Sequence, residues 1–151
     1  MVAIFSGLFV IFLTDLKYRI IPDQVLMLMI LITLSYILFY DFPSLFTRLV
    51  SGLAIFMMFL FLVIVTHGKG MGLGDVKFSF FMGLFLGFPR ILVAFYLAFL
   101  TGAAVSLILI LLGKKTMKSK IAFGPFLVYA TAISFYFGDQ IWNLFRRFLG
   151  I

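Results

Sequence analysis

Two aspartates of this chain, Asp15 and Asp75, stand where long apolar stretches meet polar connections. Carboxyl groups in such places can do acid–base chemistry, because two that lie close together cannot easily both ionise and so divide into an acid and a base. Ionisable side chains near membrane depth are rare and are functional by default. The structural alternative is that Asp15 ends one helix and Asp75 caps the next. Spacing alone leaves both interpretations open.

A glycine-rich stretch, His67-Gly68-Lys69-Gly70-Met71-Gly72-Leu73-Gly74, directly precedes Asp75. Glycine backbone can bend sharply or approach another chain closely. The stretch could therefore deliver Asp75 to a partner carboxylate or accept an extended substrate strand, and a plain flexible loop is the alternative. A phosphate-binding loop is disfavoured, because no strand precedes the stretch and no Gly-Lys-Ser/Thr follows it.

The composition places these residues in a membrane protein. Hydrophobic residues make up 65% of the 151 residues, charged residues make up 11%, and the mean hydropathy is +1.28. Soluble domains carry about 25% charged residues. The first apolar stretch lacks the basic start and the cleavage site of a signal peptide. We expect one transmembrane domain over residues 1–151.

Polar residues divide the sequence into six apolar blocks, which predict an all-α polytopic membrane protein of about six transmembrane helices. A span takes about 20 residues, so the shorter blocks must borrow from their flanks. Phe88-Pro89-Arg90 predicts a turn between the fourth and fifth blocks, with one fused helix as the alternative. Asp41 and Asp139 suit turns, and residues 139–151 suit an amphipathic helix at the interface. The blocks are at about 2–14, 25–40, 49–66, 76–88, 91–112 and 123–137.

The basic residues are distributed unevenly over the connections between these blocks. The first, third and fifth connections hold eight of the twelve Lys and Arg residues, whereas the second and fourth hold only Arg48 and Arg90. The positive-inside rule therefore places the odd-numbered connections in the cytoplasm. Asp15 and Asp75 are two spans apart, so both are expected at this face. The eight basic residues are Lys17, Arg19, Lys69, Lys77, Lys114, Lys115, Lys118 and Lys120.

The sequence also argues against several kinds of site and partner. It has no cysteine and one histidine, His67, which excludes disulfides and thiolate chemistry, and we expect no metal and no cofactor. The net charge of +7 does not indicate nucleic-acid binding, because no soluble basic domain is present to carry such a surface. We expect the lysines of residues 114–120 to contact the anionic cytoplasmic leaflet.

Three motifs resemble those of a known family. Gly72-Leu73-Gly74-Asp75 fits the GxGD signature of intramembrane aspartyl proteases, and its extension, Gly70 through Lys77, resembles bacterial type IV prepilin peptidases. Asp15-Leu16-Lys17-Tyr18-Arg19-Ile20-Ile21-Pro22-Asp23 is similar to that family's other aspartate motif. Ala122-Phe123-Gly124-Pro125-Phe126-Leu127 is similar to its Pro-Phe-Gly-Pro-Phe segment, with Ala122 in place of the first proline.

The resemblance implies that Asp15 and Asp75 are the catalytic pair of an aspartyl endopeptidase. Its substrates would be type IV prepilins or pseudopilins with a basic leader and a hydrophobic helix, cleaved at the cytoplasmic face of the inner membrane. Pro22 and Asp23 suit the first turn of the second helix, and attraction of the basic leader is an alternative role for Asp23. We assign substrate positioning or loop support to Gly72, Gly74, Lys77, Pro22 and Asp23.

One departure from the family's pattern matters. Larger members carry an N-terminal segment with paired cysteines and also methylate the new N-terminus, whereas this chain starts at the first aspartate helix. We therefore expect a short, peptidase-only member or a truncated one, without methyltransferase activity. The other candidates are a different GxGD protease, a small transporter or channel, which would place aspartates mid-span, and a membrane scaffold without enzymatic activity.

Overall fold

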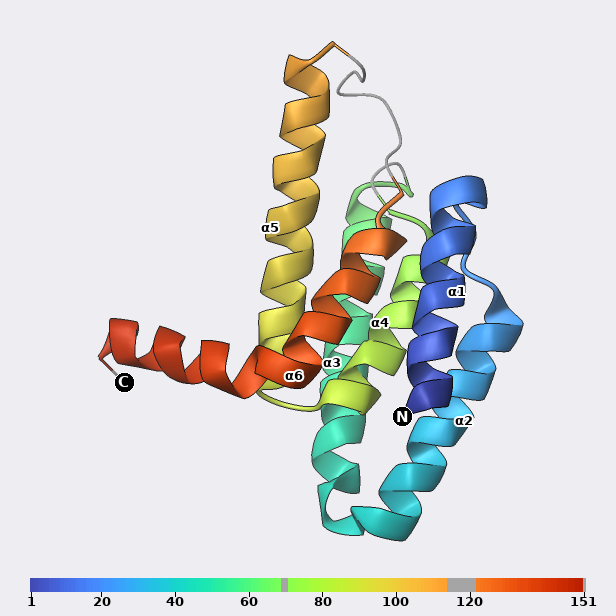
Figure 1. Ribbon diagram of the computed structural model, residues 1–151, viewed down its shortest axis with the longest axis vertical. Helices are drawn as coiled ribbons and strands as arrows, with labels where there is room; N and C mark the ends of the chain where they lie inside the picture. The colour runs from blue at the N-terminus through green and yellow to red at the C-terminus, as the bar shows by residue number, and fades with distance from the viewer. Residues whose placement is uncertain (69–70, 114–121, 151) are drawn as a thin grey trace.

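The computed structural model describes residues 1–68, 71–113 and 122–150, which form six α-helices, one short 3-10 turn and no strand (Figure 1). Three helical stretches, Asp23–Tyr40, Phe42–Val65 and Arg90–Leu111, are each long and apolar enough to cross a membrane. The predicted fold class, an all-α polytopic membrane protein, is confirmed. The elements are α1 (Val2–Tyr18), α2 (Asp23–Tyr40), η1 (Phe42–Ser44), α3 (Leu45–Val65), α4 (Leu73–Leu86), α5 (Arg90–Leu111) and α6 (Gly124–Leu149).

Successive helices alternate in direction (Figure 1). As a result, one end of the bundle, uppermost in Figure 1, contains the ends of α1, α3 and α5 and the starts of α2, α4 and α6. We call this the site end, because Asp15 lies in the last turn of α1 and Asp75 lies in the first turn of α4. The even number of passes between the two aspartates produces the shared face that the sequence predicted.

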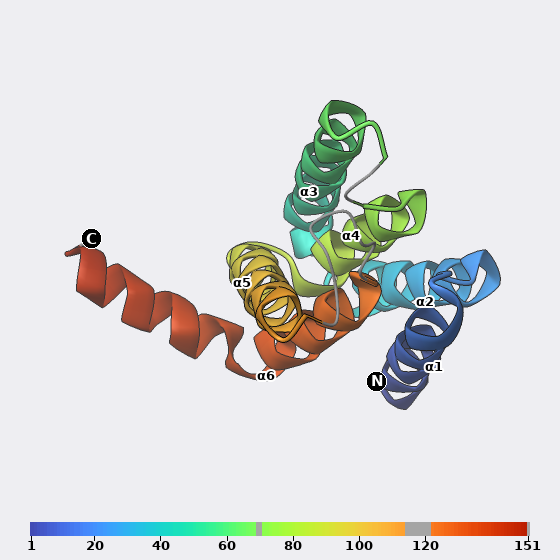
Figure 2. The ribbon, with the colours of Figure 1, turned by 90° about the horizontal axis from the view of Figure 1, so that it is seen from above.

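The short helix α4 lies at the centre of the bundle (Figure 2). It contacts α2, α3, α5 and α6, and most of its side chains are buried. Its 14 residues span about 21 Å, which is less than the roughly 30 Å of a bilayer's hydrocarbon core. Because the neighbouring helices surround α4, they and not α4 must match the thickness of the membrane.

Two glycines let α3 and α4 approach closely. A Cβ atom added at Gly83 would lie 2.4 Å from the Cα atom of Gly52, so Gly83 leaves no room for a side chain at this crossing, and one at Gly52 would be 3.2 Å from the backbone oxygen of Phe80. Small residues at helix crossings are typical of membrane bundles, where close packing replaces the hydrophobic effect as the source of helix association. This crossing fixes α4, and with it Asp75, relative to α3.

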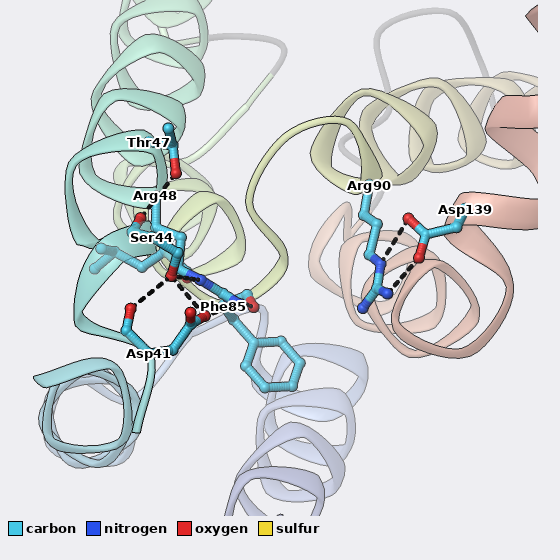
Figure 3. A network of polar contacts seen from close by, with 8 residues as sticks. Asp41, Ser44, Thr47, Arg48, Phe85, Arg90 and Asp139 are labelled. Carbon is cyan, nitrogen blue, oxygen red and sulfur yellow. Dashed lines mark hydrogen bonds and ion pairs between the residues drawn. The ribbon is translucent and has the colours of Figure 1, made fainter. Parts of the chain in front are cut away.

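Two ion pairs lie at the end of the bundle opposite the site end (Figure 3). Arg48 donates to the carboxylate of Asp41 at 3.1 Å and to the backbone oxygen of Phe85 at 2.7 Å, so it joins the start of α3 to the end of α4. Arg90 donates to both carboxylate oxygens of Asp139. Arg48 and Arg90 are the two basic residues of the predicted second and fourth connections, which the positive-inside rule leaves poor in positive charge. In the structure each of them pairs with a carboxylate.

Several predicted boundaries are wrong by a few residues. α1 continues to Tyr18 and α4 begins at Leu73, so Lys17 and Lys77 lie inside helices and not in connections, and Asp15 and Asp75 lie at helix ends as predicted. Helix capping explains why α4 begins before its apolar block, because Gly72 is already the N-cap of α4. The predicted separation of α4 from α5 near Pro89 is confirmed.

The C-terminal tail is helical as predicted, but it is not a separate helix. α6 continues through Asp139 to Leu149, so the turn predicted at Asp139 is wrong. The second half of α6 runs across the direction of the bundle and leaves it (Figure 1). Leu144 and Phe148 on this half are exposed, and Arg146 and Arg147 lie in its last turn. This orientation is the one that an interfacial amphipathic helix requires.

Candidate active site

Asp15 and Asp75 line the same pocket at the site end, although each is nearly buried, with 5% and 7% of its surface exposed. The pocket has a volume of about 250 Å³ and is built from the end of α1, the start of α2 and the start of α4. Except for Pro22, every site residue predicted from the sequence lines it. The lining residues are Asp15, Arg19, Ile20, Ile21, Asp23, Gly72, Leu73, Gly74, Asp75 and Lys77.

One carboxylate oxygen of Asp75 caps its own helix. The backbone N–H of Gly72 donates to Oδ2 of Asp75 at 3.1 Å, and the backbone N–H of Asp75 donates to the carbonyl oxygen of Gly72 at 3.2 Å. The structural interpretation of Asp75 as a cap is therefore correct for one oxygen. Oδ1 accepts no hydrogen bond from the described part of the chain and stays available. The cap orients the carboxylate and occupies only one of its two oxygens.

The backbone carbonyl of Asp15 takes part in the C-cap of α1. The backbone N–H of Arg19 donates to the carbonyl oxygen of Asp15 at 2.9 Å, and Arg19 adopts a left-handed conformation that ends α1. Oδ2 of Asp15 is buried and has no hydrogen-bond partner among the residues that the structure describes. Buried polar atoms are almost always paired, so an exception needs an explanation. A role in binding a reactant would be such an explanation.

Gly124, the first residue of α6, lies directly against Asp15. A Cβ atom added at Gly124 would come within 2.5 Å of Oδ2 of Asp15, so only glycine leaves the carboxylate its present position. Gly124 was not among the site residues predicted from the sequence. The signal was present, because Gly124-Pro125 opens the predicted sixth helix inside the third motif, but spacing along the chain does not reveal that α6 starts beside α1.

Gly74 lets the start of α4 pack against the connection between α1 and α2. A Cβ atom at Gly74 would lie 3.3 Å from the Cβ atom of Ile21, tighter than most such contacts, whereas one at Gly72 would meet only ordinary van der Waals contacts. The two aspartate motifs are therefore in direct contact through Gly74 and Ile21. Gly74 acts in packing, and Gly72 acts through its backbone N–H.

Asp23 and Lys77 form an ion pair at the edge of the pocket. Nζ of Lys77 lies 2.8 Å from Oδ1 and 2.7 Å from Oδ2 of Asp23, and both side chains are exposed to solvent. Asp23 is the first residue of α2, as predicted, whereas Pro22 is its N-cap and precedes the first turn. The pair joins the start of α2 to the start of α4.

The part of the chain that the structure describes has no cluster of metal-binding side chains. Within the described residues no three His, Asp or other metal-binding side chains cluster. Of the five acidic residues, Asp41 and Asp139 are paired at the opposite end, and the other three line the pocket. The chemistry that this arrangement offers is that of two nearly buried carboxyl groups beside a glycine-rich backbone.

Comparison with known proteins finds relatives of this chain. A prepilin leader peptidase/N-methyltransferase of Bacillus subtilis is 25% identical over 146 residues, which cover 97% of this chain and 58% of that protein. The proteins of the same name from Pseudomonas aeruginosa and Aeromonas hydrophila are 29% and 30% identical and cover 95% and 84% of this chain, or 51% and 45% of their own lengths. The chain thus spans about half the length of the curated relatives it matches.

No solved structure matches this chain. The model of the type IV leader peptidase family matches residues 2–107, a stretch that contains both Asp15 and Asp75 and ends before Gly124. The match covers more than two thirds of the chain and includes both aspartate motifs. This chain belongs to the type IV leader peptidase family.

Proposed function

We propose that this protein is a membrane aspartyl endopeptidase that removes the leader from type IV prepilins or pseudopilins with Asp15 and Asp75. The observation that carries the proposal is that two carboxyl groups, 60 positions apart in the sequence, line one pocket at one end of a helical bundle. Membership of the type IV leader peptidase family supports the reaction and the class of substrate.

The two carboxyl groups can divide the work of peptide hydrolysis. One, as the carboxylate, takes a proton from water, and the other, as the acid, donates a hydrogen bond to the scissile carbonyl oxygen. The attack gives a tetrahedral intermediate, whose collapse breaks the C–N bond while a carboxyl group delivers a proton to the leaving amine. The two groups titrate as a pair, so the roles belong to the pair and not to either residue.

The substrate would be a hydrophobic helix with a basic leader, and cleavage would take place at the cytoplasmic face of the inner membrane. The described cations of the site end, among them Lys17 and Arg19, support this orientation, because basic residues accumulate on the cytoplasmic side. The expected lipid contacts of Lys114, Lys115, Lys118 and Lys120 fall outside the described residues. A transporter is less well supported, because Asp15 and Asp75 lie at helix ends and not at mid-span.

The test is cleavage of a prepilin-like peptide by the purified chain and by its Asp15→Asn and Asp75→Asn variants in neutral detergent. Asparagine keeps the size of each side chain but cannot act as an acid or a base, so each variant is expected to lose cleavage. Normal cleavage by either variant would exclude the pair as the catalytic machinery.

The matched control is Asp41→Asn, which makes the same chemical change at the opposite end of the bundle. We expect it to keep the cleavage rate of the wild type. Helicity and elution volume of all three variants should match the wild type, which separates loss of chemistry from loss of fold.

A further inference from the structure

Asp23 is the one carboxylate of the pocket that a ligand can reach freely. Its side chain is 65% exposed, whereas Asp15 and Asp75 are nearly buried. The remaining acidic residues of the chain are paired at the opposite end of the bundle. A cationic peptide that approaches the basic site end therefore meets one accessible negative charge, and that charge belongs to Asp23.

The present partner of Asp23 is easily exchanged. The ammonium group of Lys77 contacts both carboxylate oxygens, at 2.8 and 2.7 Å, and 51% of the Lys77 side chain is exposed. Ion pairs exposed to this degree contribute little net free energy, because water solvates both ends when they separate. Another cation can therefore replace Lys77 at Asp23 with little loss.

We propose that Asp23 recognises a lysine or arginine side chain of the bound peptide, and that Lys77 occupies this position in the free protein. The inference rests on the proposed function, since it assigns a specificity residue to that same pocket. The geometry supports it because Asp23, Lys77 and Asp75 line one pocket, so a peptide bond at Asp75 brings the flanking residues within reach of Asp23. A guanidinium group would bind best, since it can pair with both oxygens at once.

This proposal and a structural role for the pair predict different effects of replacing Lys77. If the pair only fixes the start of α2 against the start of α4, then Asp23→Asn and Lys77→Gln both weaken the enzyme, and they do so for every peptide. If Asp23 recognises a cation, Lys77 competes with the substrate. Removing Lys77 then improves binding of a cationic peptide, while removing Asp23 weakens it.

The experiment compares two fluorescent peptides that differ only in lysine or glutamine residues before the cleavage site. Cleavage is measured with wild type, Asp23→Asn and Lys77→Gln in neutral detergent. For the lysine peptide we expect Asp23→Asn to raise KM by about fivefold at unchanged kcat, and Lys77→Gln to lower KM by a similar factor. For the glutamine peptide we expect no change in either variant. Equal losses on both peptides would overturn the proposal. An unchanged or higher KM of the lysine peptide with Lys77→Gln would overturn it as well.

Binding without cleavage separates this inference from the proposed function. The anisotropy of each peptide is measured with Asp15→Asn and with Asp15→Asn combined with Asp23→Asn. If the Asp15→Asn variant prefers the lysine peptide and the added Asp23→Asn substitution removes that preference, the recognition site is supported. This holds even if the wild type cleaves neither peptide, because the missing cleavage would reject only the proposed function. Cleavage by the wild type without any preference would reject only the recognition site. Absence of both binding and cleavage would reject both.

Discussion

Gly124 and Asp15, from opposite ends of the sequence, are in contact: a methyl group at Gly124 would approach Oδ2 of Asp15 to 2.5 Å. The contact joins the third motif of the sequence to the first and gives the start of α6 a place in the pocket. The contact also allows the effect of Gly124→Ala on Asp15 to be separated from its effect on stability. Gly124 is the first residue of a helix, where alanine is well tolerated.

Gly124→Ala is therefore expected to lower cleavage without lowering stability. The added Cβ displaces the Asp15 carboxylate, and a displacement of about 1 Å at a reacting group can reduce the rate on the order of 100-fold. The measurements are the initial cleavage rate and the thermal unfolding midpoint in detergent. Unchanged cleavage would show that Asp15 does not need its present position.

Gly83→Ala is expected to have the opposite effect and to destabilise the fold. The new Cβ would lie 2.4 Å from the Cα atom and 2.6 Å from the backbone nitrogen of Gly52, and backbone atoms cannot rotate away. We expect a loss of about 3 kcal/mol in the free energy of unfolding. Gly102→Ala is the matched control, because its closest contact at 3.0 Å is the ring of Phe123, which can shift. Equal unfolding midpoints for the two variants would contradict the close α3–α4 crossing.

Asp41 is expected to make stability depend on pH at the opposite end of the bundle. The hydrogen bond from Ser44, together with Arg48, holds the pKa of Asp41 below its ordinary value of 3.8. A carboxyl group with a lowered pKa stabilises the fold when the pH is above the group's ordinary pKa. This contribution is lost as the pH falls through the lowered pKa. Asp41→Asn should therefore lower the unfolding midpoint at neutral pH, with the difference from wild type shrinking in acid. A difference that stays constant with pH would argue against the ion pair.

The cleavage rate is expected to show a bell-shaped dependence on pH. The proposed chemistry needs one ionised and one protonated carboxyl group, so the rate falls when both are protonated and when both are ionised. The measurement is kcat/KM across the pH range in neutral detergent, with unfolding followed in parallel. A rate that stays level from acid to alkali would exclude a shared proton between Asp15 and Asp75.

The membrane fold and the shared face of Asp15 and Asp75 could be predicted from the sequence because both depend on simple quantities. Hydropathy identifies the apolar helices, and the number of passes between two residues decides whether they return to the same side. Helix ends were harder to predict. Asp15 and Asp75 belong to the helices themselves, since backbone capping by Arg19 and Gly72 extends α1 and α4 beyond their apolar blocks.

Contacts between distant segments could not be predicted. Nothing local in the sequence indicates that Gly124 lies against Asp15, that Lys77 pairs with Asp23, or that Arg90 pairs with Asp139 inside α6. The Gly138-Asp139 dipeptide favours a turn by local propensity, but the helix continues because tertiary contacts outweigh that propensity. The assignment of Asp15 and Asp75 as the catalytic pair stays a prediction for the variants to test.

The unequal lengths of α4 and α5 place Asp75 well short of the far end of α5. The two helices meet at the end opposite Asp75, and α5 continues well beyond α4 towards the site end (Figure 1). With 22 residues against 14, α5 is longer by about 12 Å. Its far end is apolar and exposed at Leu107 and Leu111, which suits a surface that faces lipid. Asp75 therefore lies deeper along the bundle axis than the far end of α5, and we expect a substrate peptide to reach past that end to meet it.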